Sequence, residues 1–310
     1  MTDLPQRQHN EVDGKRIGDE IIATVATAVA QLKSTGWSPK LVAIMVGSSP
    51  AIDLYVRNQR AAAGRVGVDY EVRAFPSETT EQEVLGAITA MNADPRVTGL
   101  IIQRPVPPGI NIRVLQSAVH PLKDVEGLHP ASIGNIVYNE LDLAPCTASA
   151  AVEILRRTGL TLEGLEVVVV GHSEIVGKPI AFLLMAEGAT VTVCHNMTRS
   201  VAMHSRRADA VFVAVGQPRL ITADMIKPGA ALIDIGINRI PGPDGRMITV
   251  GDVDYASCQP VAGWITPVPG GVGPVTIATL MRNTLVAAQR QKSHYESAFA
   301  ATDTLPPRRA

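Results

Sequence analysis

The sequence of 310 residues has few cysteines, no long hydrophobic run and almost no net charge, and each shortage excludes a class of protein. Cys146, Cys194 and Cys258 are an odd number, widely spaced and without a CxxC pattern, which argues against a disulfide framework and a zinc site. No window reaches the ~18 apolar residues of a membrane span, and residues 1–13 are polar, unlike a signal peptide. We therefore expect a cytoplasmic protein in a reducing compartment.

The charges of the chain balance almost completely, with 28 basic against 29 acidic residues. This balance gives no electrostatic reason to expect nucleic acid or an anionic membrane as a partner. The seven histidines lack a metal-ligand spacing such as HExxH, and we predict no metal site. A small molecule is the expected ligand.

Apolar residues make up 46% of the chain, which is enough to bury parallel strands in a globular fold. A chain of 310 residues exceeds what one hydrophobic core usually organises, so we expect two domains. In the first half, helix-like and strand-like segments alternate, as is typical of parallel strands with crossover helices. These segments are a helix over 14–36, a strand over 41–47, a helix over 51–67, a strand over 68–76, a helix over 80–92 and a strand over 99–107.

A second alternating series begins with the apolar run at 167–170, after a polar stretch around 120–145 and a helix over 149–159. Further strands are expected over 189–194, 208–216 and 230–238, followed by a helix from Pro274 to about 291. We predict an α/β protein with an N-terminal α/β domain, a C-terminal Rossmann-like domain and a final helix that returns to the N-terminal domain. The expected bounds are 1–147, 148–285 and 286–310, with a disordered tail over 302–310.

The segment VVVVGHSEIVGKPI at 167–180 ends a strand at Gly171 and begins a helix around Gly177. Backbone N–H groups and the helix dipole can hold a pyrophosphate at such a turn. The spacing is G-x-S-x-x-x-G rather than G-x-G-x-x-G, so alone it fits an ordinary strand–turn–helix connection equally well. The buried strand before it, Pro179 in the first helical turn and the strands that follow favour a dinucleotide site.

The second strand of this series ends at Cys194, His195 and Asn196, without the acid that usually holds the ribose of NAD. We therefore favour NADP, with His172, Asn196 and Arg199 near its extra phosphate. The alternative is that His172 and Arg199 are solvated surface residues, and binding of NAD stays open.

Six motifs occur in order along the chain: YVRNQR at 55–60, IIQRPVP at 101–107, PLKDVEG at 121–127, the GHSEIVGKP loop, GDVDY and ITPVPGGVGP. Over residues 12–290 they resemble the bifunctional methylenetetrahydrofolate dehydrogenase/cyclohydrolase family. The resemblance implies a homodimer that binds a tetrahydrofolate derivative in a cleft between its domains. The implied substrate contacts are Tyr55, Gln103, Glu126, Pro269, Gly270 and Gly271. The implied cofactor contacts are Gly171, His172, Ser173, Val176, Gly177, Asn196, Ile237 and Thr276.

One departure from the family concerns its central catalytic group. The family helix reads Y-x-x-x-K from Tyr55, and the position of that catalytic lysine holds Gln59 here. Ile52 replaces the serine that usually precedes the tyrosine by three residues. Because an amide cannot titrate, Gln59 cannot act as a general acid or base.

Further departures affect the predicted folate and cofactor contacts. Glu126 stands where the family has a folate-binding aspartate. Either the pterin sits differently, or the ligand is a modified folate, or Glu126 reaches the same atoms through another rotamer. Ala148 and Ala150 replace proline and glycine, which fits drift at tolerant positions. His172 replaces the loop arginine used towards the NADP phosphate, and Asn196 replaces a serine.

The two family reactions make different demands on the Gln59 position. Hydride transfer from the methylene bridge needs positioning, which Tyr55, Gln103 and Glu126 can still supply, and no protein base. Hydrolysis of the methenyl cation needs a titratable group, worth about 10²- to 10⁴-fold in rate. We expect a dehydrogenase with weak or absent cyclohydrolase activity. The alternatives are a non-catalytic folate- or dinucleotide-binding paralogue, and another two-domain dehydrogenase acting on shikimate or amino acids.

Overall fold

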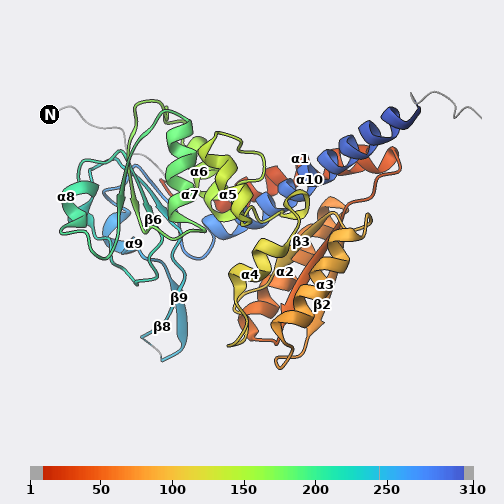
Figure 1. Ribbon diagram of the computed structural model, residues 1–310. Helices are drawn as coiled ribbons and strands as arrows, with labels where there is room; N and C mark the ends of the chain where they lie inside the picture. Colours follow the sequence, from red (N-terminus) through yellow and green to blue (C-terminus); the bar gives the residue numbers. More distant parts are fainter. Residues whose placement is uncertain (1–9, 244, 304–310) are drawn as a thin grey trace, which may run out of the picture. The chain divides into compact units, whose positions relative to one another are not determined.

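The computed structural model describes residues 10–243 and 245–303, which form two compact units (Figure 1). Among the described residues, the N-terminal unit comprises Ile21–Gly134 together with residues 280–303. The C-terminal unit comprises Asn135–Thr279 together with residues 10–20. The final helix beyond Leu280 therefore packs with the N-terminal unit, which confirms its predicted return.

The N-terminal unit contains a parallel sheet of order β2-β1-β3. Its strands are β1 (Lys40–Val46), β2 (Asp69–Phe75) and β3 (Gly99–Ile102), connected through helices α2 (Pro50–Val66) and α3 (Glu81–Ala93). Alternate residues of β1, such as Val42 and Ile44, join a buried cluster with Val84 and Ile88 of α3. The predicted alternation of strands and helices is confirmed in this unit.

Strand β3 is shorter than predicted: it ends at Ile102, whereas the sequence predicted a strand to residue 107. Pro105 and Pro107 follow closely, and a proline has no N–H to donate to a strand ladder. Gln103 therefore lies just beyond the carboxyl end of β3 and donates its backbone N–H to Ile44. This end of a parallel sheet is where α/β proteins bind ligands.

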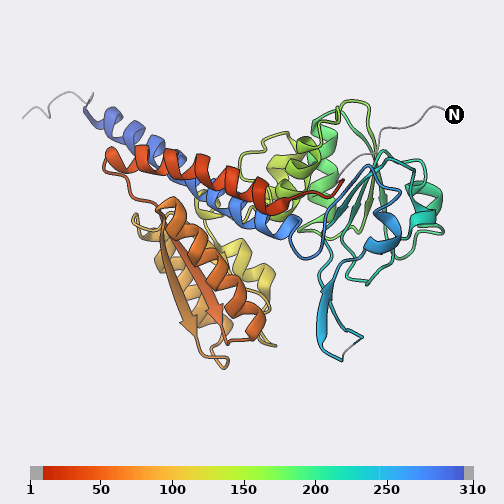
Figure 2. The same ribbon diagram turned by 180° about the vertical axis from the view of Figure 1, so that it is seen from behind.

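The stretch around 120–145, described from the sequence only as polar, contains helical turns. They are η1 (Pro121–Lys123) and α5 (Pro130–Val137), and α4 (Ile112–Ala118) comes before them. These helices have only three to eight residues, which is too short for a clear period of 3.6 residues. Helix α1 (Gly14–Ser34) ends near the predicted residue 36, and its later part lies beside α10 in both ribbon views (Figures 1 and 2).

The C-terminal unit contains a five-stranded parallel sheet of order β10-β7-β6-β4-β5, as expected for a Rossmann-like domain. Its strands are β4 (Glu166–Val170), β5 (Thr190–Cys194), β6 (Ala210–Val213), β7 (Ala231–Asp234) and β10 (Trp264–Ile265). Its helical segments are α6 (Cys146–Arg157), α7 (Gly177–Ala186), α8 (Val201–Ser205), η2 (Ala223–Met225) and α9 (Tyr255–Cys258). A separate antiparallel pair joins β8 (Asn238–Pro241) to β9 (Met247–Val250).

Helix α10 (Val272–Asp303) is longer than the predicted helix from Pro274 to about 291. Residues 292–303 contain no glycine or proline, and the Lys292–Glu296 ion pair of 2.6 Å has helical spacing. Residues 302 and 303 of the predicted disordered tail are therefore helical, and 304–310 lie outside the described residues. No helix among the described residues is long and apolar enough to cross a membrane.

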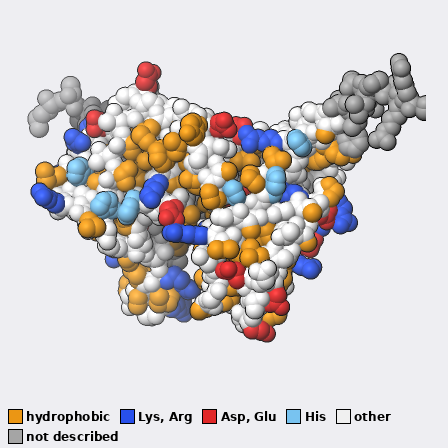
Figure 3. Space-filling view, viewed as in Figure 1, with side chains coloured by type: hydrophobic (Ala, Val, Ile, Leu, Met, Phe, Trp, Pro, Cys, Tyr) orange, Lys and Arg blue, Asp and Glu red, His pale blue; other side chains and the backbone are white. Residues whose placement is uncertain are grey.

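Basic and acidic side chains are interspersed on the face shown in Figure 3, without a large area of one sign. This distribution agrees with the nearly neutral net charge of −1. It gives no support on that face to a polyanionic partner.

Candidate active site

A hydrogen-bonded cluster in the N-terminal unit connects α2, β2 and the end of β3. The side-chain carbonyl of Gln59 accepts hydrogen bonds from the Tyr70 hydroxyl at 2.9 Å and from the Gln103 amide at 2.8 Å. Gln59 is half-buried, and Gln103 is buried with 7% of its surface exposed. Because a carbonyl oxygen has two lone pairs, the Gln59 Oε1 atom is saturated and its Nε2 group is left as a donor.

Glu126 lies at the same end of the sheet and accepts a hydrogen bond from the backbone N–H of Ile102 at 3.1 Å. Burial raises the pKa of this carboxyl to about 7, although the Ile102 N–H and the Arg104 guanidinium both oppose the rise. Asp124 adds a smaller upward shift to that pKa. The Glu126 carboxyl therefore exchanges protons near neutral pH, as acids in functional sites often do.

Tyr70 is a titratable group in contact with Gln59 that was not predicted from the sequence. Burial raises the pKa of its phenol above the ordinary range, and the charge of Glu126 acts in the same direction while Arg60 opposes it. The Arg60 guanidinium carbon lies 5.9 Å from the centre of the Tyr70 ring. Tyr70 therefore stays protonated at neutral pH and donates a hydrogen bond without acting as a base.

Among the described residues, Gln59 is hydrogen-bonded through its side chain to Tyr70 and Gln103 and not to a lysine. Lys123 is the buried lysine of the PLKDVEG segment, and its ammonium donates to the carbonyls of Met91 at 2.8 Å and Asp94 at 2.6 Å. Asp124 of the same segment accepts hydrogen bonds from His129 N–H and the Ser132 hydroxyl. These two residues hold the loop that carries Glu126.

The other predicted residues of helix α2 have different surroundings. Tyr55 lies one turn before Gln59 and exposes 46% of its surface. Ile52 is buried with 2% exposed, so its side chain packs in the core. Ser49 caps the helix by accepting from the Ile52 N–H, and Pro50 follows in the first turn.

The turn between β4 and α7 brings the backbone at Gly171 close to Gly177. A Cβ atom at Gly177 would lie 2.0 Å from the Gly171 carbonyl oxygen, so this turn requires glycine. The Ser173 hydroxyl accepts hydrogen bonds from the N–H groups of Val176 at 3.2 Å and Gly177 at 3.4 Å. A tight glycine turn that leads into a helix fits the phosphates of a dinucleotide, as the sequence predicted.

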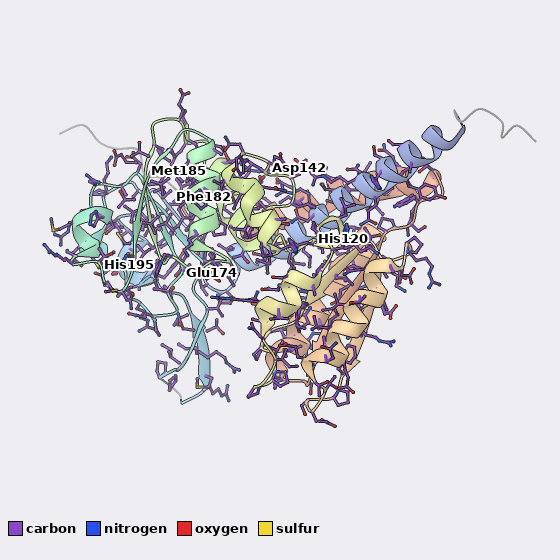
Figure 4. The ribbon with its side chains drawn as sticks, in the orientation of Figure 1. His120, Asp142, Glu174, Phe182, Met185 and His195 are labelled. Carbon is purple, nitrogen blue, oxygen red and sulfur yellow. The ribbon has the colours of Figure 1, made fainter. Side chains whose placement is uncertain are left out.

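Two histidines meet where β4 and β5 end. The ring centres of His172 and His195 lie 4.8 Å apart, and His172 is exposed. Figure 4 shows His195 beyond the end of β5, with Glu174 in the neighbouring β4–α7 turn. Asn196 and Arg199 are exposed in the segment after His195. His172, Asn196 and Arg199 were predicted from the sequence, but the contact between His172 and His195 was not, because it depends on the pairing of β4 with β5.

Two family models match this chain in order. Residues 12–126 match the tetrahydrofolate dehydrogenase/cyclohydrolase catalytic domain, and residues 145–292 match the NAD(P)-binding domain of the same enzymes. The chain belongs to the tetrahydrofolate dehydrogenase/cyclohydrolase family. This confirms the resemblance drawn from the six motifs and excludes a shikimate or amino acid dehydrogenase.

Relatives from this family match nearly the whole chain. Bifunctional protein FolD 2 of Mesorhizobium japonicum is 65% identical over 292 residues, covering 94% of this chain and 95% of the relative. The bifunctional FolD of Campylobacter jejuni has a TM-score of 0.86 at 36% identity and covers 90% of this chain and 98% of its own. The Trypanosoma brucei enzyme, solved with NADP cofactor and an inhibitor, has a TM-score of 0.85 at 36% identity and covers 90% of this chain and 97% of its own.

In the NAD(P)-binding domain of this family member, a buried carboxylate joins three loops. Asp252 accepts hydrogen bonds from the N–H groups of Val215 and Gly216 after β6, and from the Asn238 side chain after β7. Its neighbour Asp234 accepts from the Asp252 N–H, and burial raises the pKa of Asp234 to about 6. These bonds fix the loops that follow β6 and β7. The loops lie at the carboxyl edge of the sheet, where dinucleotides bind.

The remaining predicted contacts also belong to the C-terminal unit. Ile237 is 60% exposed between β7 and β8. The Thr276 hydroxyl donates to the Val272 carbonyl within α10, at 3.1 Å. The segment Pro269, Gly270 and Gly271 precedes α10. The predicted residues thus form two groups, with Tyr55, Gln59, Gln103 and Glu126 in the N-terminal unit and the others in the C-terminal unit.

Proposed function

We propose that this chain is a cytoplasmic, NADP-dependent methylenetetrahydrofolate dehydrogenase whose cyclohydrolase activity is much reduced. The observation that carries the proposal is Gln59, an amide at the position of the family lysine, with its carbonyl held by Tyr70 and Gln103. Membership of a bifunctional family supports the dehydrogenase and cyclohydrolase chemistries, and the side chain at this position decides between them.

The oxidation requires the methylene carbon to lose a hydride, and the folate nitrogen lone pairs stabilise the methenyl cation that forms. NADP, when bound, accepts the hydride. The residues of this chain orient the ligand: Glu126 binds the amino-pyrimidine edge through its carboxylate, and Gln103 and Tyr55 border the reacting bridge. No proton moves to or from the protein in this step, so the loss of the lysine is tolerated.

The hydrolysis requires water to add to the methenyl carbon and a proton to reach a ring nitrogen as the C–N bond breaks. Gln59 cannot exchange a proton, and Tyr70 cannot act as a base at neutral pH because the pKa of its phenol is raised. Glu126 remains titratable, with a pKa of about 7, but its carboxylate is engaged with the pterin. We therefore expect hydrolysis slower by about 10²- to 10⁴-fold than a lysine-assisted reaction.

The choice of NADP is supported by the absence of an acidic residue at the end of β5 and by the Trypanosoma relative that was solved with NADP. We propose that His172, together with Asn196 and Arg199, lies near the 2′-phosphate. Calorimetric titration is expected to give tighter binding of NADP than of NAD. Equal affinity for the two would place these side chains in solvent.

Two further features of the ligand and assembly are proposed. Glu126 either holds an ordinary folate through a different rotamer or selects a modified one, and a comparison of dissociation constants for several reduced pterins decides between them. The chain is also expected to form a homodimer, so sedimentation equilibrium should give twice the chain mass of 32.8 kDa. A mass of one chain would refute the dimer.

The decisive experiment follows both half-reactions on the purified protein. With methylenetetrahydrofolate and NADP, we expect reduced nicotinamide to form and methenyltetrahydrofolate to accumulate. Rapid methenyl hydrolysis that is unaffected by Gln59→Ala would refute the loss of the second activity. No reduction of either NADP or NAD would instead favour a ligand-binding paralogue without turnover.

A further inference from the structure

Tyr70 is the residue of the Gln59 cluster with no assigned role in the reaction. It lies on β2, pairs with Leu41 of β1 in the sheet, and extends its hydroxyl to the Gln59 carbonyl at 2.9 Å. We infer that Tyr70 is a positioning residue, which orients the Gln59 amide so that its Nε2 group donates to the folate ligand. This inference rests on the proposed function for the nature of the ligand.

A glutamine amide has two orientations that exchange its oxygen and its nitrogen. In the observed orientation, Oε1 accepts from both Tyr70 and Gln103, so both donors are satisfied by one atom. The reversed orientation would present N–H groups to the Tyr70 hydroxyl, and the proton of this half-buried phenol would lose its acceptor. One hydrogen bond of ordinary strength favours the observed orientation by about fivefold to tenfold.

The surroundings of Tyr70 keep it a donor. Arg60 follows Gln59 on α2, and its guanidinium lies 5.9 Å from the centre of the Tyr70 ring, within the range of a cation–π contact. Burial and the nearby Glu126 carboxylate raise the pKa of the phenol against the opposing charge of Arg60, so the hydroxyl keeps its proton. Tyr70 therefore holds Gln59 from the protein side without competing for the Nε2 group.

The consequence for ligand recognition is a neutral donor in place of a cation. With Oε1 saturated, the Gln59 side chain offers N–H groups to an acceptor atom of the ligand, such as a carbonyl oxygen or a ring nitrogen lone pair. Rotation of the amide would place an oxygen there, which repels the same acceptors. Tyr70, together with Gln103, thus favours the orientation in which the Gln59 side chain binds acceptor atoms of the folate.

A double-mutant cycle of Tyr70→Phe and Gln59→Leu tests this inference. The probe is 5-formyltetrahydrofolate, a stable reduced folate, titrated by calorimetry against the full-length protein. Removing the fivefold to tenfold preference leaves the two amide orientations about equally populated, so we expect Tyr70→Phe to weaken binding by about 1.5-fold to twofold in the native background and to leave it unchanged in the Gln59→Leu background. NADP affinity should stay unchanged in every variant.

Equal losses in both backgrounds would show that Tyr70 acts independently of Gln59, and no loss in the native background would also overturn the inference. Tyr138→Phe is the matched control, because Tyr138 is 83% exposed and belongs to the C-terminal unit. Thermal unfolding of each variant separates misfolding from lost binding. Because the cycle measures binding and not turnover, failure of the proposed dehydrogenase activity leaves its result interpretable.

Discussion

Glu126 is a half-buried acid whose neighbours only partly compensate for its charge. Its pKa is raised to about 7 from an ordinary value of 4.5, with burial as the largest cause. Between about pH 4.5 and about pH 7, the folded protein therefore binds more protons at this site than the unfolded chain does. The contribution of Glu126 to stability is fully present below this window and is lost as the pH rises through it.

Replacement of Glu126 by glutamine should remove this loss. The glutamine Oε1 atom can still accept from Ile102, so the fold is retained. Urea unfolding at about pH 5 and about pH 8 gives the drop in unfolding free energy between these two pH values. We expect this drop to be smaller in the variant than in the native protein, by on the order of 1–3 kcal/mol. The pKa of Asp234 is also raised, to about 6, but this residue is present in both proteins. Its contribution to the pH dependence of stability therefore cancels in the comparison. Identical losses in the two proteins would show that the Glu126 pKa is ordinary.

At the scale of single residues, the sequence identified Gln59, Gln103 and Glu126 but not Tyr70. The first three belong to recognisable motifs. Tyr70 lies in a strand whose alternation predicts its face but not the reach of its side chain. Its partner Gln59 lies on the preceding helix, 11 residues away, and the contact depends on how α2 packs against β2.

In the turn from β4 to α7, the backbone lies so close to Gly177 that a larger side chain does not fit there. A Cβ at Gly177 would meet the Gly171 carbonyl carbon at 2.7 Å as well as its oxygen, so Gly177→Ala must move the turn. We expect a loss of about 2–4 kcal/mol in unfolding free energy and weaker NADP binding.

Gly86→Ala in α3 is the matched control for this glycine. A Cβ there meets no atom within 4 Å, and alanine favours a helix interior by about 0.5–1 kcal/mol. Urea unfolding of both variants should therefore give changes of opposite sign. Destabilisation of the two by similar amounts would mean that the close approach at Gly177 is not what matters.

Elements were predicted better in their order than at their ends. The alternation of strands and crossover helices was readable because buried parallel strands are apolar and short. The end of β3 was missed because the apolar Val106 was included in the strand, although it lies between Pro105 and Pro107, which have no N–H to donate to the ladder. The end of α10 was missed because its last turns, around Tyr295, lack a regular apolar face.

For the whole molecule, the sequence predicted two α/β units and the return of the final helix to the N-terminal unit, but not that the start of the chain belongs to the C-terminal unit. Residues 10–20 join the C-terminal unit, while residues 280–303 join the N-terminal unit. The unit boundaries at Glu20 and Leu280 fall inside helices α1 and α10. Neither a change in composition nor a turn signal therefore marks these boundaries in the sequence. The expected bounds 1–147, 148–285 and 286–310 remain predictions.

The proposed loss of one of two activities is tested most directly by Gln59→Lys. The Tyr70 hydroxyl and the Gln103 carbonyl can both accept from an ammonium group at this position. Restoring the titratable amine should accelerate methenyltetrahydrofolate hydrolysis by about 10²-fold or more, while hydride transfer to NADP changes by less than about fivefold. Gln59→Met, similar in size and uncharged, should leave hydrolysis slow. If the native protein hydrolyses the methenyl compound as fast as the lysine variant, the account is contradicted.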